Sequence, residues 1–158
     1  MKMKRYMIVA LLSMLIACSE PIEVKPFTYP QVFTGDGVRK AWSIRSVQLL
    51  QKGKGTQTFR FDPCTLDDLY VFYNNSERSY QVTMGATKCE DTDPVVIADS
   101  NWSFVNATAT LTIVMPLLSD SPLPFVLNEI DETKMVLDIY FDDNNSNYRF
   151  NFKPAALE

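Results

Sequence analysis

Residues 108–115 read Thr-Ala-Thr-Leu-Thr-Ile-Val-Met, with threonines at positions 108, 110 and 112 and apolar side chains between them. Successive side chains of a β-strand point to opposite faces, so this alternation predicts a strand with one buried face. The same two-residue period occurs in residues 57–61, 80–84, 135–142 and 148–153. The pattern predicts an all-β protein.

Further strands are expected where β-branched and aromatic residues cluster with less regular alternation. These segments are residues 41–50, 69–73, 102–105 and 125–130. Between the strands lie turn-forming stretches rich in Asn, Asp and Ser, at residues 74–77, 106–107, 131–132 and 142–147. Only residues 65–68, after Pro63, indicate a helical turn. About eight to nine short strands without a long helix favour an antiparallel up-and-down barrel or a sandwich.

The N-terminus has the composition of an export signal. Lys2, Lys4 and Arg5 precede a stretch, residues 6–17, that contains no charge. Its 12 residues are too few for a membrane-spanning helix, which needs about 20. The sequence Leu-Ile-Ala-Cys at 15–18 resembles the bacterial lipobox, which implies cleavage before Cys18 and acylation of that cysteine. The alternative is an ordinary secretory signal that happens to contain a cysteine.

The chain after the signal is the size of one domain. With residues 1–17 removed, 141 residues remain, with 12 basic and 19 acidic side chains and a net charge of −7. Such a surface repels phosphates, which argues against a nucleic-acid partner. Residues 18–36 contain three prolines and no apolar period, so we expect a lipid-anchored flexible tether, followed by the folded domain at 37–158.

The expected location is the bacterial outer membrane, with the membrane as a partner through acylated Cys18. In some Bacteroidetes-type lipoproteins, acidic residues just after the cysteine accompany export to the cell surface. This chain has two such residues, Glu20 and Glu23. The periplasmic and cell-surface faces both stay open.

Assigning Cys18 to lipid leaves Cys64 and Cys89, which we expect to form a disulfide in an exported protein. A metal or redox role is disfavoured because the chain has no histidine and no Cys-x-x-Cys spacing. No cofactor is expected. The lack of histidine also removes the usual general base, and the adjacent carboxylates Asp67 and Asp68 fit turn chemistry, so we do not expect an enzyme.

Several motifs together resemble the lipocalin-like domains of Bacteroidetes lipoproteins. They are Trp42 near the domain start, Asp-Pro-Cys-Thr-Leu-Asp-Asp at 62–68 with Cys89 as the partner of its cysteine, Asn-Trp-Ser at 101–103, the strand at 108–112 and the aromatic strand at 148–152. The resemblance covers residues 38–154 and implies a lipocalin-like barrel that can enclose a small hydrophobic molecule. The Gly-x-Trp of lipocalins is replaced here by Lys40-Ala41-Trp42. The arginine that often packs over this tryptophan would correspond to Arg149, and the alternative from the alternation is that Arg149 is a solvated strand residue.

A ligand-binding barrel would be lined by inward-facing apolar residues, with Trp42 closing one end. The candidate lining residues are Trp42, Phe59, Phe61, Tyr80, Trp102, Phe104, Leu137, Ile139 and Phe150. The alternative is a packed barrel, because an eight-stranded interior is only just wide enough for its own side chains. The protein would then be a structural or interaction component of the envelope. It would contact an envelope protein or a glycan through its sheet, a strand edge or its loops, of which the expected ones are a long loop at 86–100 and a proline-bearing loop at 119–125.

Overall fold

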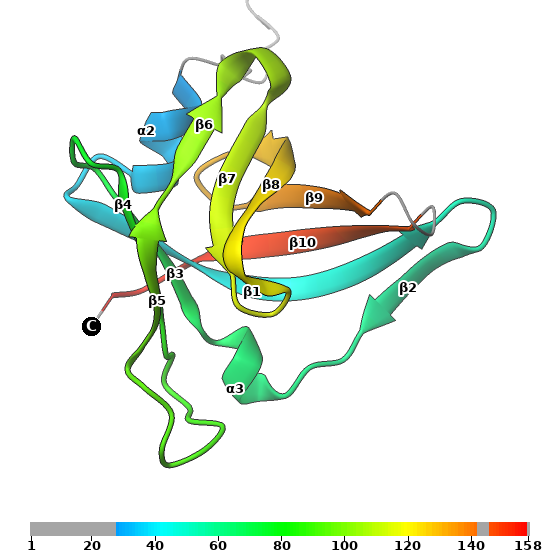
Figure 1. Cartoon of the computed structure of the whole chain (residues 1–158), viewed down its shortest axis with the longest axis horizontal. Helices are drawn as coiled ribbons and strands as arrows, with labels where there is room; N and C mark the ends of the chain where they lie inside the picture. The colour runs from blue at the N-terminus through cyan, green and yellow to red at the C-terminus, as the bar shows by residue number, and fades with distance from the viewer. Residues whose placement is uncertain (1–27, 142–145, 158) are drawn as a thin grey trace, which may run out of the picture.

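The computed structural model describes residues 28–141 and 146–157 (Figure 1). The expected signal peptide, Cys18 and most of the tether lie outside the described residues, as does most of the predicted turn at 142–147. The described part contains ten strands: β1 (Arg39–Gln51), β2 (Gly55–Phe59), β3 (Leu69–Tyr73), β4 (Ser79–Thr83), β5 (Val96–Asn101), β6 (Ser103–Val105), β7 (Thr110–Met115), β8 (Ser119–Ile130), β9 (Met135–Phe141) and β10 (Ser146–Ala155). Its helices are short: α2 (Tyr29–Thr34), α3 (Pro63–Leu66) and a 3₁₀ turn at Asn106–Thr108.

The strands form one antiparallel sheet that curls into a nearly closed barrel. Its order is β5-β4-β3-β1-β10-β9-β8-β7-β6, with β2 paired to β1 off this path. The two ends of the path, β5 and β6, are separated in the chain by Trp102 alone. One continuous stretch therefore pairs with β4 before this residue and with β7 after it. The predicted all-β, up-and-down barrel is confirmed.

Strand β1 is shared by three neighbours. Along one edge, its N-terminal half pairs with β3 and its C-terminal half with β2, while β10 pairs along the other edge. Because β2 pairs only with β1, it leaves the barrel wall as an arm, drawn at the right of Figure 1. A bulge at Arg45 adds one residue to β1, so Ile44 and Val47 both face the core.

The inward side chains pack into one continuous core. The largest fully buried side chains are Trp42, Tyr70, Tyr80, Phe33, Phe72, Phe125, Phe150 and Phe152. Their rings meet edge to face or offset, as in the pair Tyr70–Phe152 at 5.3 Å between centroids. The Tyr80 hydroxyl is buried and donates to the carbonyl oxygen of Val114 at 2.9 Å, so the core leaves this polar group satisfied.

Helix α2 closes one end of the barrel, with Pro30 in its first turn. Phe33 is fully buried, and its ring lies 5.6 Å from that of Phe72 and 5.3 Å from that of Phe104. The Trp42 indole N–H donates to the Phe33 carbonyl oxygen at 3.0 Å. The tether expected over 18–36 therefore does not extend through residues 29–34. A single turn of helix carries too few apolar positions to show a period in the sequence.

The side chain over Trp42 also differs from expectation. The Lys40 ammonium lies 4.2 Å from the centre of the Trp42 ring, where a cation is attracted to the face of the indole. Arg149 instead pairs with Asp138 on the neighbouring strand.

Two segments expected as loops contain strand, one in its last third and the other throughout. Residues 96–100 of the predicted 86–100 loop belong to β5, and the predicted proline-bearing loop at 119–125 is the first half of β8. That half pairs with β7 alone, since pairing with β9 begins at Val126. Pro122 and Pro124 are tolerated there because one edge of the strand needs no donors. The predicted helical turn after Pro63 is present as α3.

Candidate functional site

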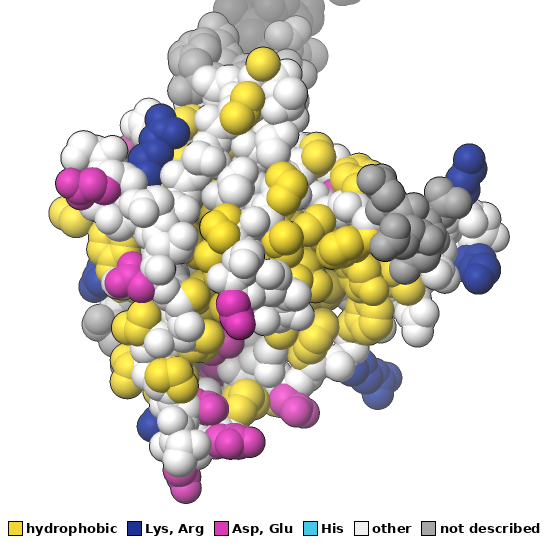
Figure 2. Space-filling view, viewed as in Figure 1, with side chains coloured by type: hydrophobic (Ala, Val, Ile, Leu, Met, Phe, Trp, Pro, Cys, Tyr) yellow, Lys and Arg dark blue, Asp and Glu magenta, His cyan; other side chains and the backbone are white. Residues whose placement is uncertain are grey.

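The end of the barrel away from α2 holds a cavity of about 490 Å³. We call it the mouth and define it by its lining residues Val47, Phe59, Phe61, Leu117, Leu118, Phe141, Tyr148 and Phe150. Figure 2 shows hydrophobic side chains gathered here, between the β7–β8 turn and the β2 arm. None of the lining residues that the structure describes is charged. Its volume falls within the range of about 300–1,000 Å³ that is usual for small-molecule sites.

One wall of the mouth comes from the β1–β2 hairpin. Gly53 and Gly55 turn the chain with φ angles of 80° and 77°, a backbone that other residues rarely adopt. The resulting register places Phe59 beside Val47 on the inner face. The Phe59 ring stacks on that of Tyr148 at 5.7 Å. The β2 arm thus leaves the barrel wall but keeps aromatic contact with β10.

The opposite wall comes from the β7–β8 turn and the end of β9. The turn is closed by a hydrogen bond from the Leu118 N–H to the Met115 carbonyl oxygen at 2.8 Å, which fixes Leu117 and Leu118 against the core. Phe141 is 37% exposed and meets the Tyr148 ring edge to face at 5.8 Å. The rim is therefore apolar and open to solvent.

The floor of the mouth is the packed core. Phe150 is 1% exposed and contacts the buried ring of Phe125 at 5.9 Å. Leu137 and Ile139 fill the interior on β9. A ligand can therefore enter the mouth without moving the core, but the barrel has no deep empty interior along these residues.

The predicted lining residues fall into three groups. Phe59, Phe61 and Phe150 line the mouth. The core contains Tyr80, Leu137 and Ile139. Beneath α2 lie Trp42, Trp102 and Phe104. Sequence reasoning did not include Val47, Leu117, Leu118, Phe141 and Tyr148.

On the outer face of the barrel wall, an ion pair between Asp138 and Arg149 connects β9 to β10. Asp138 is 2% exposed and accepts two hydrogen bonds from the Arg149 guanidinium, both at 2.8 Å. These hydrogen bonds to Asp138 raise the pKa of Arg149. Since the two residues are directly opposite in the register, the pair fixes the alignment of two strands that carry mouth residues.

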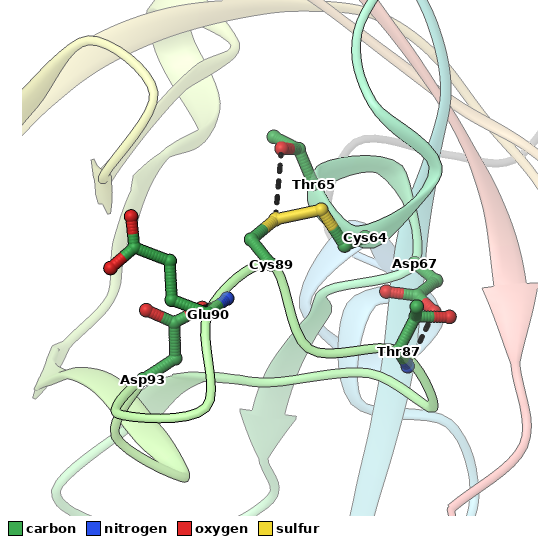
Figure 3. The surroundings of a disulfide bond; sticks show 7 residues. All are labelled: Cys64, Thr65, Asp67, Thr87, Cys89, Glu90 and Asp93. Carbon is green, nitrogen blue, oxygen red and sulfur yellow. Dashed lines mark hydrogen bonds between the residues drawn. A yellow bond between two sulfur atoms is a disulfide. The ribbon is translucent and has the colours of Figure 1, made fainter.

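The predicted disulfide between Cys64 and Cys89 is confirmed, with Cα atoms 5.3 Å apart (Figure 3). It ties α3 to the loop after β4, and Cys64 is three residues beyond Phe61 of the mouth in the chain. Beside it, Asp67 accepts a hydrogen bond from the Thr87 N–H at 2.9 Å. Burial raises the pKa of Asp68 to about 6. A hydrogen bond from the Gly85 backbone lowers this pKa, and the neighbouring Asp67 and Asp93 carboxylates raise it by smaller amounts. The loop is thus pinned at several points.

No protein-family model matches this sequence, and comparisons with curated proteins and with solved structures give no significant match. Within residues 28–141 and 146–157, no three Asp, Glu or Cys side chains are grouped to hold a metal ion. Nor does that part of the chain contain a helix long and apolar enough to cross a bilayer.

Proposed function

We propose that this protein is a membrane-anchored, lipocalin-like lipoprotein that binds a small hydrophobic molecule at the mouth of its barrel. The observation that carries the proposal is the mouth itself, a cavity of about 490 Å³ lined by eight side chains without a charge among them. Binding sites for small apolar molecules are usually clefts of this size with few polar groups. We propose binding rather than catalysis, because among the described residues that line the mouth there is no acid, base or nucleophile beyond the Tyr148 hydroxyl.

The lining favours a flat or aliphatic ligand with few polar atoms. Five of the eight side chains are aromatic, and only Tyr148 carries a polar atom. A charged group entering this cavity would lose its water without gaining a partner, which costs several kcal/mol. The expected ligand is therefore uncharged, at least in the part that enters the mouth.

The proposed anchor would hold the barrel in a defined orientation. Thr28, the first described residue, precedes α2 at the closed end and is ten positions after Cys18 in the sequence. Such a stretch reaches at most about 36 Å when fully extended. An acylated Cys18 would thus attach the closed end to the outer membrane, on its periplasmic or cell-surface face, and leave the mouth free to take up a ligand.

Ligand binding can be tested with the uncharged fluorophore N-phenyl-1-naphthylamine and the chain from residue 18 onward, with Cys18→Ser. We expect saturable fluorescence enhancement at micromolar probe concentrations. Leu118→Glu places a carboxylate in the mouth and should weaken binding at least about tenfold. Val105→Glu is the matched control, since Val105 is 51% exposed and does not line the mouth. Equal affinity in the two variants would contradict the proposal.

Anchoring has its own test in a bacterial host supplied with labelled fatty acid. The unaltered chain should incorporate the label, and the Cys18→Ser variant should not. Labelling that survives the substitution would remove Cys18 as the attachment site.

The alternative is a packed barrel that acts as an envelope interaction component. It is favoured by three consecutive exposed apolar residues, Val95, Val96 and Ile97, which are 66%, 44% and 37% exposed. In this case the mouth would bind no probe, and substituting these three residues with serine would abolish cross-links to a partner in intact cells.

A further inference from the structure

A second concave site lies on the outer wall of the barrel and shares no residue with the mouth. It is a groove of about 930 Å³ over the outer faces of β1, β3 and β4. The loop after β4 and helix α3 border it, as do the C-terminal end of β10 and the two residues after it, Ala156 and Leu157. We call it the outer groove.

The floor of the outer groove is largely apolar. Val71 is buried on β3, and the half-buried Leu69 lies two residues before it on the same face. Leu66 from α3 and Val95 from the loop add to the walls. The Cys64–Cys89 disulfide joins α3 to this loop, so a covalent link limits how far the two walls can separate.

Three cations, Arg39, Arg45 and Lys153, follow β1 and β10 along this groove. Lys153 is directly opposite Ser43, and Arg45 is two residues further along β1 at the bulge. Arg39 lies four residues before Ser43, which is about 13 Å along a strand. The three cations therefore form a row along the groove, in which Arg45 and Lys153 are neighbours and Arg39 lies further along the floor.

These cations lack carboxylate partners. Lys40, Lys134 and Arg149 each lie within 4.0 Å of an Asp or Glu oxygen, whereas in the described part of the chain Arg39, Arg45 and Lys153 do not. Arg39 donates to the Tyr73 hydroxyl at 3.3 Å, a neutral partner. Among the described groove residues, the one acidic side chain is Asp67, which accepts a hydrogen bond from the Thr87 N–H. An excess of positive charge thus remains here on a protein with a net charge of −4.

We propose that the outer groove binds an anionic amphiphile, with its aliphatic chain on the half-buried Leu66 and Leu69 and its anionic head between Arg45 and Lys153. Charge complementarity selects the head, because unpaired cations beside an apolar surface gain charge-assisted hydrogen bonds from a carboxylate or phosphate. A peptide is disfavoured because the floor is the face of a paired sheet, so it offers no free backbone groups for strand addition.

The proposal can be tested with decyl phosphate below its micelle concentration, followed by amide chemical shifts of the ¹⁵N-labelled chain from residue 18 onward, with Cys18→Ser. Saturable shifts are expected at Ser43, Val71 and Lys153. The double variant Arg45→Gln/Lys153→Gln should weaken binding at least about tenfold, since it removes both contacts to the head. The matched control is Lys52→Gln/Lys54→Gln, which removes two cations of the β1–β2 hairpin and should change the affinity less than about twofold.

All four substituted residues are exposed, so the variants should stay folded, as their spectra will show directly. Shifts confined to mouth residues, or an unchanged affinity in the Arg45→Gln/Lys153→Gln variant, would overturn the proposal. Decanol, which lacks the charge, should not shift the groove residues. The Leu118→Glu variant, which blocks the mouth, should bind decyl phosphate in the groove as the unaltered protein does. Failure of the groove and failure of the mouth are therefore distinguishable.

Discussion

Replacing Phe33 with alanine tests whether α2 is a structural plug or part of a tether. The ring is fully buried and lies within 6 Å of three other rings, those of Phe72, Trp102 and Phe104. Removing a buried phenylalanine typically costs about 3–5 kcal/mol through lost burial and the cavity left behind. Each aromatic pair adds about 0.5–1.5 kcal/mol. We expect a loss of about 4 kcal/mol in the free energy of unfolding.

The assay is urea unfolding of the chain from residue 18 onward, with Cys18→Ser and intrinsic tryptophan fluorescence as the signal. With a urea dependence of about 1–3 kcal/mol per molar, the midpoint should fall by more than about 1 M. Phe141→Ala is the matched control, because this ring is 37% exposed at the rim and its loss should cost about 1 kcal/mol or less. A Phe33→Ala midpoint equal to that of the control would mean that α2 does not stabilise the barrel.

Three further perturbations address the disulfide loop. The free energy of unfolding of the Cys64→Ser/Cys89→Ser variant should be lower by about 3 kcal/mol, as expected for a crosslink between residues 25 positions apart. If urea unfolding shows a loss under about 1 kcal/mol, the disulfide does not stabilise the fold. Gly85→Ala should lower the Tm by several degrees because its Cβ would overlap the Asp67 carbonyl oxygen. Gly37→Ala should not, because its Cβ would only touch the Arg39 carbonyl oxygen at 4.0 Å; equal melting temperatures would contradict the Gly85 contact. Burial raises the pKa of Asp68 from 3.8 to about 6, so the folded state binds this proton more tightly and stability should fall as pH rises from about 4 to 6. Asp68→Asn should flatten this part of the stability–pH profile. At pH 7 it should add on the order of 1 kcal/mol to the free energy of unfolding, a value already reduced for solvent screening. An unchanged stability–pH profile in chemical denaturation would refute this prediction.

Alternation in the sequence was enough to find the strands whose inner faces carry large apolar side chains. Strand β3 was predicted with its observed bounds. Strand β5 was missed because its inward positions are small: Ala98 lies opposite Val82, and Ser100 lies opposite the large ring of Tyr80. A strand that fits small residues against large neighbours has no apolar period of its own.

The candidate site was only partly predictable for a related reason. A two-residue period separates inward from outward side chains but does not tell how deep a residue lies along the barrel. Phe59 at the mouth and Leu137 in the core therefore had the same pattern. Tyr148 has the same period as Phe150 and could have been included, whereas Leu117 and Leu118 lie in a turn, where no period exists.

The pairing of β1 with β10 has a consequence for the order of folding. The first strand of the described chain is matched to the last over ten residue pairs, with partners such as Val47 and Phe150 about one hundred positions apart. Contacts between residues this far apart in the chain form late in folding, because closing the long loop costs chain entropy before strand pairing can compensate for it. Until β10 has been made, β1 and β9 both lack a neighbour, so a nascent chain cannot complete the barrel. For a protein exported as proposed above, this topology would keep the chain from folding completely, and therefore able to pass through an export channel, until its final strand had crossed the membrane.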